Sequence, residues 1–410
     1  MGFFTASTLP VFSPKLSGGP ECSECGRFKV CGEHPKQFDP ALGKGRVLVI
    51  HNAPADQQGG HARPPESLRQ TLGRMDLLHE TDFMGVIACP SEKTTIKEAA
   101  HCRPWFVKKL AEAQPRVIIP IGQEAISSTI GHLWGVEAGR ARKWAGRRIP
   151  DQTLNAWVCP IATGDAAVAE IDKLWFNMHL REASKVAETG KRPWKDVPNF
   201  LSKIRIVYDH REAAEVLRNL TRNPPAAIAF DYECTGLKPE LDAHKIYTCS
   251  VAWGDGKWPD GCIAYPWVGE AVEATSALLR SPVPKIAQNA KFEERWTIRK
   301  LGHRVRNWVW CTQLGAHWED PTEETKGLEF QAYATLGFKQ WASSITPFLE
   351  ANGANAFNQI QKAPLGDLLL YNGLDSYLEY AIAWQQWKRN GLNYQEVLGL
   401  GQQKTSETPQ

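Results

Sequence analysis

The sequence predicts an α/β protein of two domains, the first on a parallel αβα sheet and the second on a mixed sheet. A chain of 410 residues is longer than one hydrophobic core usually supports, and its 42% hydrophobic content is that of a globular protein. Short β-branched runs alternate with stretches of helical spacing, which is typical of sheets covered by helices. The segment 189–203, rich in Pro and basic residues, interrupts this alternation and is the expected linker.

Changes in composition along the chain predict the domain boundaries. Residues 1–20 are rich in Pro, Gly and Ser and are expected to be loosely ordered, whereas residues 396–410 form a polar tail. Between these ends, we expect the first domain over residues 21–188 and the second over residues 204–395, on either side of the linker.

The elements of the first domain follow from its hydrophobic pattern. Short runs rich in Val and Ile are typical of strands that are buried on both faces. We expect strands at 46–51, 84–88, 117–120 and 157–161. We expect helices at 65–75, at 95–113, from 122 onward and at 165–185.

The pattern restarts at residue 204 and predicts the elements of the second domain. Several strands separated by turns open this domain, which indicates a meander within a mixed sheet. We expect strands at 204–208, 246–253 and 261–266, and a central strand that runs into Asp231 and Glu233. We expect helices at 211–221, 272–280 and 326–337.

Charge and hydropathy exclude some classes of protein. The net charge is only +3, so any contact with nucleic acid has to come from local basic patches rather than from the whole chain. No apolar run is long enough to span a bilayer, and the first residues, MGFFTASTLPVF, lack the basic region of a secretory signal. We therefore expect a cytosolic protein without a membrane partner.

The strongest indication of chemistry is the run AIAFDYECTGL at 227–237. Its buried apolar start predicts a strand, and the alternation of side chains along a strand places Asp231 and Glu233 on the same face. Two carboxylates at the end of a buried strand are costly unless a cation lies between them. The alternative is an acidic strand end that faces solvent, and further acidic motifs decide between the two.

Two further motifs follow in the sequence. Asn289 begins the run NAKFE, which ends at Glu293. Tyr371 and Asp375 are four residues apart, and this spacing places both side chains on one face of a helix. Each motif alone has many chance matches, but the three in this order predict one acidic site.

The three motifs together resemble those of the DEDD 3′–5′ exonucleases, in the subgroup with a tyrosine in its third motif. The resemblance implies a ribonuclease-H-like fold and two Mg²⁺ or Mn²⁺ ions held by carboxylates. We expect these carboxylates to be Asp231, Glu233, Glu293 and Asp375, with Glu293 standing where the family usually has Asp. Tyr371 is expected to orient the attacking water, and Asn289 to order its loop or contact the substrate strand. The family acts on DNA and RNA, and the likeness to polymerase exonucleases favours DNA 3′ ends.

Four of the ten cysteines are the candidate ligands of a second metal centre. They are Cys22, Cys25, Cys89 and Cys102, which come from a loop, the end of a predicted strand and a predicted helix. A cytosolic chain does not use such cysteines as a disulfide scaffold, and four thiolates hold either Zn²⁺ or a [4Fe–4S] cluster. Their spacing does not separate these two alternatives.

The stretch from about 20 to 180 resembles the family-four uracil-DNA glycosylases, which carry a [4Fe–4S] cluster. The likeness rests on the early Cys-x2-Cys, on CRPW at 102–105, on VLVIHNAPA at 47–55 and on PRVIIPIGQEA at 115–125. The family's polar pocket residues are altered here, and the candidate pocket is His51, Asn52, Asp56 and Thr163, with Thr163 in place of a histidine. That histidine stabilises the departing base, so we expect the fold without ordinary uracil excision.

A basic run with an aromatic residue is a candidate DNA-binding loop. It contains Arg140, Arg142, Lys143, Trp144, Arg147 and Arg148. Basic side chains contact phosphates and an interleaved aromatic ring stacks on bases. A solvated surface loop is an equally good interpretation of this run.

The combination of domains resembles part of a phage polymerase. Some phage polymerases join a glycosylase-like domain, an exonuclease domain and a polymerase, and this chain resembles the first two. We expect a proofreading-type exonuclease that works with a separately encoded DNA polymerase, in the host cytoplasm if a phage encodes it. The alternatives are a repair enzyme whose first domain still excises a damaged base, and an accessory protein that mainly binds DNA or docks on a polymerase.

Overall fold

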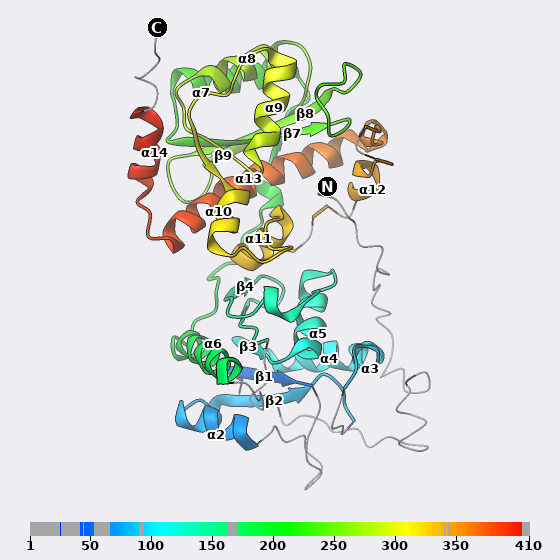
Figure 1. The fold of residues 1–410 in the computed structure, drawn as a ribbon, viewed down its shortest axis with the longest axis vertical. Coiled ribbons are helices and arrows are strands. Elements are labelled where there is room, and N and C mark those ends of the chain that lie inside the picture. The colour runs from blue at the N-terminus through cyan, green and yellow to red at the C-terminus, as the bar shows by residue number, and fades with distance from the viewer. Residues whose placement is uncertain are drawn as a thin grey trace. The chain divides into compact units, whose positions relative to one another are not determined.

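The computed structural model in Figure 1 describes most of the chain. It describes residue 25 and residues 42–43, 45–52, 66–89, 94–162, 170–339, 341–342, 344–353 and 355–403. The candidate residues Cys22, Asp56 and Thr163 lie outside the described residues. The described chain divides into two compact units, with the change between Pro198 and Asn199. Residues 333–339 are grouped with the N-terminal unit, and the remaining residues after 198 with the C-terminal unit.

The sheet of the N-terminal unit has five strands in the order β2-β1-β3-β5-β4. They are β1 (Val47–His51), β2 (Thr81–Gly85), β3 (Val117–Pro120), β4 (Ile149–Asp151) and β5 (Ala156–Val158). β1, β2, β3 and β5 are parallel, as predicted, but β4 pairs with β5 in the antiparallel sense. The sheet is therefore mixed and not purely parallel, because a short turn with Asn155 at φ +48° folds this edge into a hairpin.

Two predicted elements of this unit differ from the structure. The strand expected at 84–88 lies at Thr81–Gly85, so Cys89 follows the strand after a bend and does not end it. The helix expected at 95–113 is two helices, α3 (Ile96–His101) and α4 (Arg103–Ala113). Pro104 has no backbone N–H with which to continue the ladder of α3, so a new helix starts at Arg103 and Cys102 lies at the junction.

The other helices of the N-terminal unit cover its sheet. They are α2 (Glu66–Arg74), α5 (Gln123–Trp134) and α6 (Glu170–Glu188), with 3₁₀ turns at Leu78–Glu80 and Ala141–Lys143. Leu72 of α2 and Leu180 of α6 join Val49 and Ile119 of the sheet in one buried apolar cluster. The β-branched strands thus lie between helices, as their continuous hydrophobic runs predict.

The sheet of the C-terminal unit has six strands in the order β11-β10-β7-β8-β9-β6. They are β6 (Arg205–Ile206), β7 (Ala227–Cys234), β8 (Ile246–Gly254), β9 (Gly261–Pro266), β10 (Lys285–Ala287) and β11 (Trp308–Cys311). β8 is antiparallel to both β7 and β9, whereas β7, β10 and β11 run parallel. The predicted mixed sheet is confirmed, and the strand that carries Asp231 and Glu233 lies inside it.

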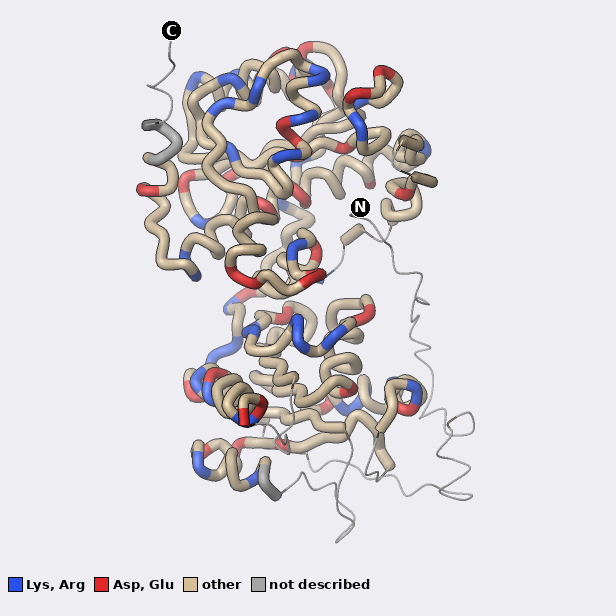
Figure 2. Tube along the Cα trace, in the orientation of Figure 1, with Lys and Arg blue, Asp and Glu red and all other residues tan. Residues whose placement is uncertain are grey.

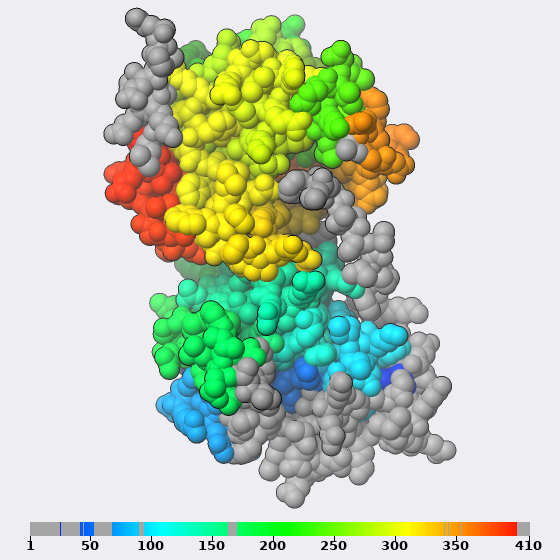
Figure 3. Space-filling model, viewed as in Figure 1, coloured from blue at the N-terminus to red at the C-terminus, as the bar shows by residue number. Residues whose placement is uncertain are grey.

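Helices lie on both sides of this sheet. They are α7 (His210–Arg222), α8 (Glu270–Arg280), α9 (Ala290–Leu301), α10 (Thr312–Glu319), α11 (Leu328–Leu336), α12 (Thr346–Leu349), α13 (Leu365–Arg389) and α14 (Tyr394–Gln403), with 3₁₀ turns at Leu201–Lys203 and Ile360–Lys362. α7 and α8 lie on one side of the sheet and α13 on the other (Figure 1). The chain from α9 to α11, yellow in Figure 3, forms much of the face of this unit shown there. No helix among the described residues is long and apolar enough to cross a membrane.

The long helix α13 approaches the sheet most closely at Gly373. A Cβ atom at this position would lie 2.3 Å from Cγ2 of Ile204 and 3.3 Å from Cβ of Ala264. Real Cβ atoms do not tolerate the shorter distance, so a side chain here would push the helix away from β6 and β9. The missing side chain at Gly373 therefore fixes the height of α13 above the sheet.

Replacement of Gly373 by Ala tests this close approach. Ala gains helix propensity of about 0.5–1 kcal/mol, but overpacking costs about 1–3 kcal/mol, so we expect a net loss of stability of roughly 1 kcal/mol. Chemical denaturation measures the change. The matched control is Gly399→Ala on α14, where no atom lies within 4 Å of the added Cβ and stability should not fall. Equal effects of both substitutions would contradict the close packing.

Candidate active site

Strand β7 supplies the first two acids of the site. The strand is buried along almost its whole length, with Phe230 fully enclosed between Ala229 and Asp231. Asp231 is partly exposed and Glu233 is buried, and the two point to the same face because they are two residues apart. The predicted strand and the shared direction of its carboxylates are both confirmed.

Helix α13 brings the third acid to this face. Asp375 is buried, and its helix packs on β7, β8 and β9. One ligand atom each from Asp231, Glu233 and Asp375 lies within 4.8 Å of the other two. Three carboxylates from distant parts of the sequence therefore converge on one point, as the motifs predict.

Burial and mutual repulsion make these carboxylates hard to ionise by themselves. Burial raises the pKa of Asp231 to about 7, although a hydrogen bond from Asn372 acts in the opposite direction. Burial, and then the charge of Asp231, raise the pKa values of Glu233 and Asp375 well above their usual range. A divalent cation relieves both costs, and an all-oxygen donor set fits Mg²⁺ or Mn²⁺. The three residues therefore fit a hard divalent cation.

Glu293 lies beside this group but is not part of it. It is in the first turn of α9, which follows Asn289 in a left-handed conformation with φ +53°. The carboxyl group is buried, and its Oε2 has no hydrogen-bond partner among the described residues. Burial, followed by the nearby charges of Asp231 and Glu233, raises its pKa well above the usual range. An unsatisfied carboxylate oxygen next to the three acids is available to a cation.

Tyr371 lies one helical turn before Asp375 on α13. Burial and the charge of Asp375 raise the pKa of the Tyr371 phenol well above its usual range, so the hydroxyl keeps its proton at neutral pH. A hydrogen bond from this hydroxyl lowers the pKa of Asp375. Tyr371 is therefore a hydrogen-bond donor at the site, and it does not act as a base.

The structure adds three residues that the sequence motifs do not identify. Asn372 donates a hydrogen bond to Oδ2 of Asp231 at 2.8 Å, and Trp341 donates one to Oδ1 of Asp375 at 2.9 Å. Glu379 is fully buried one turn beyond Asp375, and burial and the charge of Asp231 raise its pKa well above the usual range. Glu379 is four residues after Asp375 on α13, and this helical spacing could have identified it from the sequence. Trp341 is identified only by its tertiary contact.

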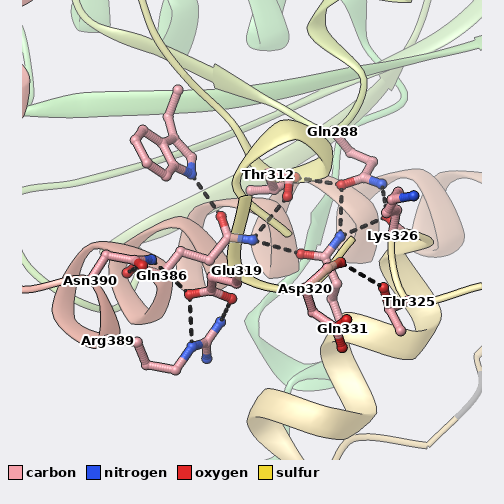
Figure 4. A network of polar contacts seen from close by, with 11 residues as sticks. Gln288, Thr312, Glu319, Asp320, Thr325, Lys326, Gln331, Gln386, Arg389 and Asn390 are labelled. Carbon is pink, nitrogen blue, oxygen red and sulfur yellow. Dashed lines mark hydrogen bonds and ion pairs between the residues drawn. The ribbon is translucent and has the colours of Figure 1, made fainter. Parts of the chain in front are cut away.

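Three glutamines connect the loop before α9 with the helices α11 and α13. Gln288 accepts hydrogen bonds from Thr312 and Gln331, and it donates one to the carbonyl oxygen of Lys326 (Figure 4). Gln386 of α13 donates to Oε1 of Gln331 and to the carbonyl oxygen of Thr312, both at 2.9 Å. Because Gln288 immediately precedes Asn289, this network fixes the loop that leads to Glu293 relative to the helix that carries Asp375.

A second group in Figure 4 secures the end of α13. Glu319, the last residue of α10, accepts hydrogen bonds from Arg389 at 2.8 and 3.0 Å and from Asn390 at 2.8 Å. The indole N–H of Trp310 donates to Oε1 of Gln386 at 2.7 Å. Bidentate contacts of this kind have a defined geometry, so they set the direction of the helix axis as well as its distance.

The candidate cluster cysteines of the N-terminal unit are buried where the structure describes them. Cys25, Cys89 and Cys102 are 8%, 6% and 6% exposed, and Cys22 lies outside the described residues. Among the described residues, only Asp231, Glu233 and Asp375 bring three metal-ligand atoms within 4.8 Å of one another, so these three thiols do not converge on one point.

The candidate pocket residues His51 and Asn52 lie at the carboxyl end of β1. His51 is buried, and Asn52 donates a hydrogen bond to Oε2 of Glu124 at 2.8 Å. Gly122, with φ +89°, lies so close that a Cβ there would be 3.3 Å from Oδ1 of Asn52. Ligands of α/β sheets bind at this end of the strands, and the sequence did not identify Glu124 as part of such a site.

The predicted stacking role of Trp144 in the basic run is wrong. Trp144 is 0% exposed and donates a hydrogen bond to the carbonyl oxygen of Ala138, and Lys143 is 7% exposed with its ammonium over the Trp144 ring. A buried ring cannot stack on a base. The exposed basic residues of the run are Arg140, Arg142 and Arg148, and Figure 2 shows basic positions interspersed with acidic ones along both units.

The raised pKa of Asp231 predicts a pH-dependent cost to stability without metal. Its folded-state pKa of about 7 exceeds the usual 3.8, so the folded protein holds a proton that the unfolded chain releases. The free energy of unfolding should therefore fall as pH rises from about 4 to about 7, by about 1.4 kcal/mol per pKa unit of difference. Asp231→Asn removes this contribution to the pH dependence. In EDTA, the free energy of unfolding of the variant relative to the wild type should therefore increase from about pH 4 to about pH 7.

Chemical denaturation at several pH values measures this difference. The exposed Asp367 on α13 gives the control Asp367→Asn, which removes a negative charge outside the acidic site. A difference in stability between Asp231→Asn and the wild type that stays constant from pH 4 to pH 7 would contradict the raised pKa of Asp231.

One family model matches the part of the chain that carries the acidic site. Residues 204–381 match the family described as 3′–5′ exonuclease. A search of curated proteins finds no match. Similar solved structures include NrnC from Brucella melitensis, with 15% identity, coverage of 49% of this chain and 89% of that one, and a TM-score of 0.33. The catalytic core of RRP6 from Trypanosoma brucei has 14% identity, coverage of 49% and 50%, and a TM-score of 0.35. RNase D from Trypanosoma brucei has 14% identity, coverage of 50% and 70%, and a TM-score of 0.36.

The family match and the geometry of the acids lead to one conclusion. The mixed six-stranded sheet fits a ribonuclease-H-like fold, and the matched range contains all the acids described above. Residues 1–203 lie outside the match. The C-terminal half of the chain is therefore a 3′–5′ exonuclease domain of the DEDD family, which makes the protein a metal-dependent hydrolase of phosphodiester bonds.

Proposed function

We propose that the exonuclease domain is of the proofreading type and removes nucleotides from DNA 3′ ends. The observation that carries the proposal is the convergence of Asp231, Glu233 and Asp375 within 4.8 Å. The presence of Tyr371 one turn before Asp375 supports the tyrosine-containing subgroup of the family. The likeness to polymerase exonucleases supports DNA as the substrate and a DNA polymerase as the partner.

The arrangement of side chains suggests a division of roles. Asp231, Glu233 and Asp375 would hold one divalent cation, and Glu293 would help to hold a second. Two such cations supply an activated water and a stabilised leaving oxygen for hydrolysis of the phosphodiester. The protonated Tyr371 hydroxyl would orient the attacking water as a hydrogen-bond donor. Asn289, in the left-handed turn before α9, would contact the terminal nucleotide of the substrate strand.

Hydrolysis of a labelled DNA primer with a mismatched 3′ end tests the proposal. We expect Mg²⁺-dependent release of 5′-mononucleotides, which EDTA abolishes. Asp231→Ala should reduce the rate by at least about 100-fold because it removes a cation ligand. The control Asp367→Asn changes an exposed acid of α13 and should leave the rate unchanged.

Several outcomes of this assay would overturn the proposal. An Asp231→Ala variant with the wild-type rate would remove the assigned site. An RNA primer of the same sequence is the second substrate, and a clear preference for it would replace DNA in the proposal. A pull-down with a DNA polymerase tests the partner separately, since hydrolysis by the isolated chain does not depend on it.

For the N-terminal unit we propose a glycosylase-like domain that binds DNA or docks on a polymerase without ordinary uracil excision. The parallel order of β2, β1, β3 and β5 and the buried thiols of Cys25, Cys89 and Cys102 support it. With Cys22, these thiols would hold a [4Fe–4S] cluster, with Zn²⁺ as the alternative. The polar pair of Asn52 and Glu124 at the strand end would replace the pocket of an excising enzyme.

Anaerobic purification with metal analysis tests the cluster. We expect broad visible absorption and about four irons per chain. Cys102→Ser should lower the iron content, while Cys159→Ser, which changes another buried cysteine of this unit outside the set, should not. A colourless protein with one zinc per chain would exclude the cluster and remove the main support for the glycosylase-like domain.

A further inference from the structure

Asn372 lies between two catalytic residues of α13 but has no role in the motif that they define. It directly follows Tyr371, and it is completely buried. Adjacent residues of a helix point about 100° apart, so Asn372 faces the sheet beneath the acids rather than the position of the substrate. A fully buried amide needs partners for its donors and its acceptor, and those partners show what it does.

Both ends of the Asn372 side chain are used by residues of the sheet. Its Nδ2 donates to Oδ2 of Asp231 at 2.8 Å and to the carbonyl oxygen of Asp231 at 3.3 Å. Its Oδ1 accepts a hydrogen bond from the hydroxyl of Thr248 on β8 at 2.9 Å. The backbone carbonyl oxygen of Asp231 can only accept, so it fixes which end of the amide carries the N–H groups. The Thr248 hydroxyl then donates to Oδ1 and holds the amide in this orientation.

We propose that Asn372 is a positioning residue that holds the Asp231 carboxylate for binding of the divalent cation, an inference that rests on the proposed function. A carboxylate whose Oδ2 is fixed by a donor cannot rotate freely about its terminal bond. The lone pairs that Asn372 does not use then have set directions and stay available to a cation. Partners of this kind around metal ligands typically affect metal affinity by about 10–100-fold.

The chemistry of the position favours an amide over other side chains of similar size. Aspartate would place a further negative charge next to Asp231, among acids whose pKa values are already raised by one another. Leucine would leave the Thr248 hydroxyl and Oδ2 of Asp231 buried without partners. Of these three side chains of similar size, only the amide of Asn offers a donor to the carboxylate and an acceptor to the hydroxyl at once.

A neighbouring hydrogen bond between α13 and β8 allows an experiment to distinguish the positioning of Asp231 from the attachment of α13 to the sheet. Ser376, one turn further along α13, forms a hydrogen bond with Ser250 of β8, and Ser250 also donates to the carbonyl oxygen of Asn372 at 2.7 Å. Ser376 and Ser250 are fully buried, as Asn372 is, but the hydrogen bonds of the Ser376 hydroxyl go to Ser250 and not to the acids. Ser376→Ala is therefore a matched control that weakens the attachment of the helix without altering the contact to Asp231.

The test is binding of Mn²⁺ to the full chain without substrate, measured by electron paramagnetic resonance or calorimetry. We expect Asn372→Ala to weaken Mn²⁺ binding by about 10–100-fold and Ser376→Ala to change it by less than about 2-fold. Thermal unfolding without metal should show comparable losses of stability for the two variants. The Mg²⁺ concentration for half-maximal hydrolysis should rise with Asn372→Ala, and a large excess of metal should recover much of the rate.

Thr248→Val is the second variant, in case Asn372→Ala does not fold. It keeps the shape of the side chain but removes the hydroxyl that orients the amide, so it should weaken Mn²⁺ binding in the same direction and by less. Wild-type Mn²⁺ affinity in a folded Asn372→Ala or Thr248→Val variant would overturn the inference while leaving the exonuclease intact. A wild-type chain that neither binds Mn²⁺ nor hydrolyses a primer would overturn the proposed function itself.

Discussion

The burial of several carboxyl groups around one point is the constraint on which the exonuclease domain depends. Asp231, Glu233 and Asp375 converge, with Glu293 and Glu379 close enough for the charges of these acids to raise their pKa values. Such a cluster opposes folding when its members are ionised, because burial removes water and brings like charges together. A bound divalent cation stabilises the ionised carboxylates and so offsets this cost. Folding and metal binding are therefore linked through the same groups.

The strands, helices and hydrogen bonds around these acids fix their positions. β7 presents two of them, and α13 presents Asp375 across the sheet at a height set by Gly373. Hydrogen bonds from Asn372 and Trp341 each occupy one oxygen of Asp231 or Asp375, respectively. The glutamine network of Figure 4 then ties the loop before Glu293 to the same helix. Rigid support of this kind pre-organises a site whose parts come from distant segments of the chain.

The N-terminal unit shows where sequence patterns mislead. The sequence around Lys143 and Trp144 is compatible with an exposed basic loop that contains an aromatic residue. In the structure the Trp144 ring is buried, and the ammonium group of Lys143 lies over it. Lys and Trp both have long apolar parts that pack in an interior, so their presence among arginines does not decide exposure. Cys102 was expected within a helix and lies between two, because Pro104 restarts the helix there.

The sequence by itself determined the α/β class and the acidic motifs of the exonuclease domain. Strand alternation and the helical i, i+4 spacing are local rules, so they placed Asp231 with Glu233 and Tyr371 with Asp375 without a structure. Only the tertiary structure decided which polar residues support those acids, the antiparallel β4 edge and the burial of Trp144. These features depend on contacts between segments far apart in the chain, and local periodicity carries no information about such contacts.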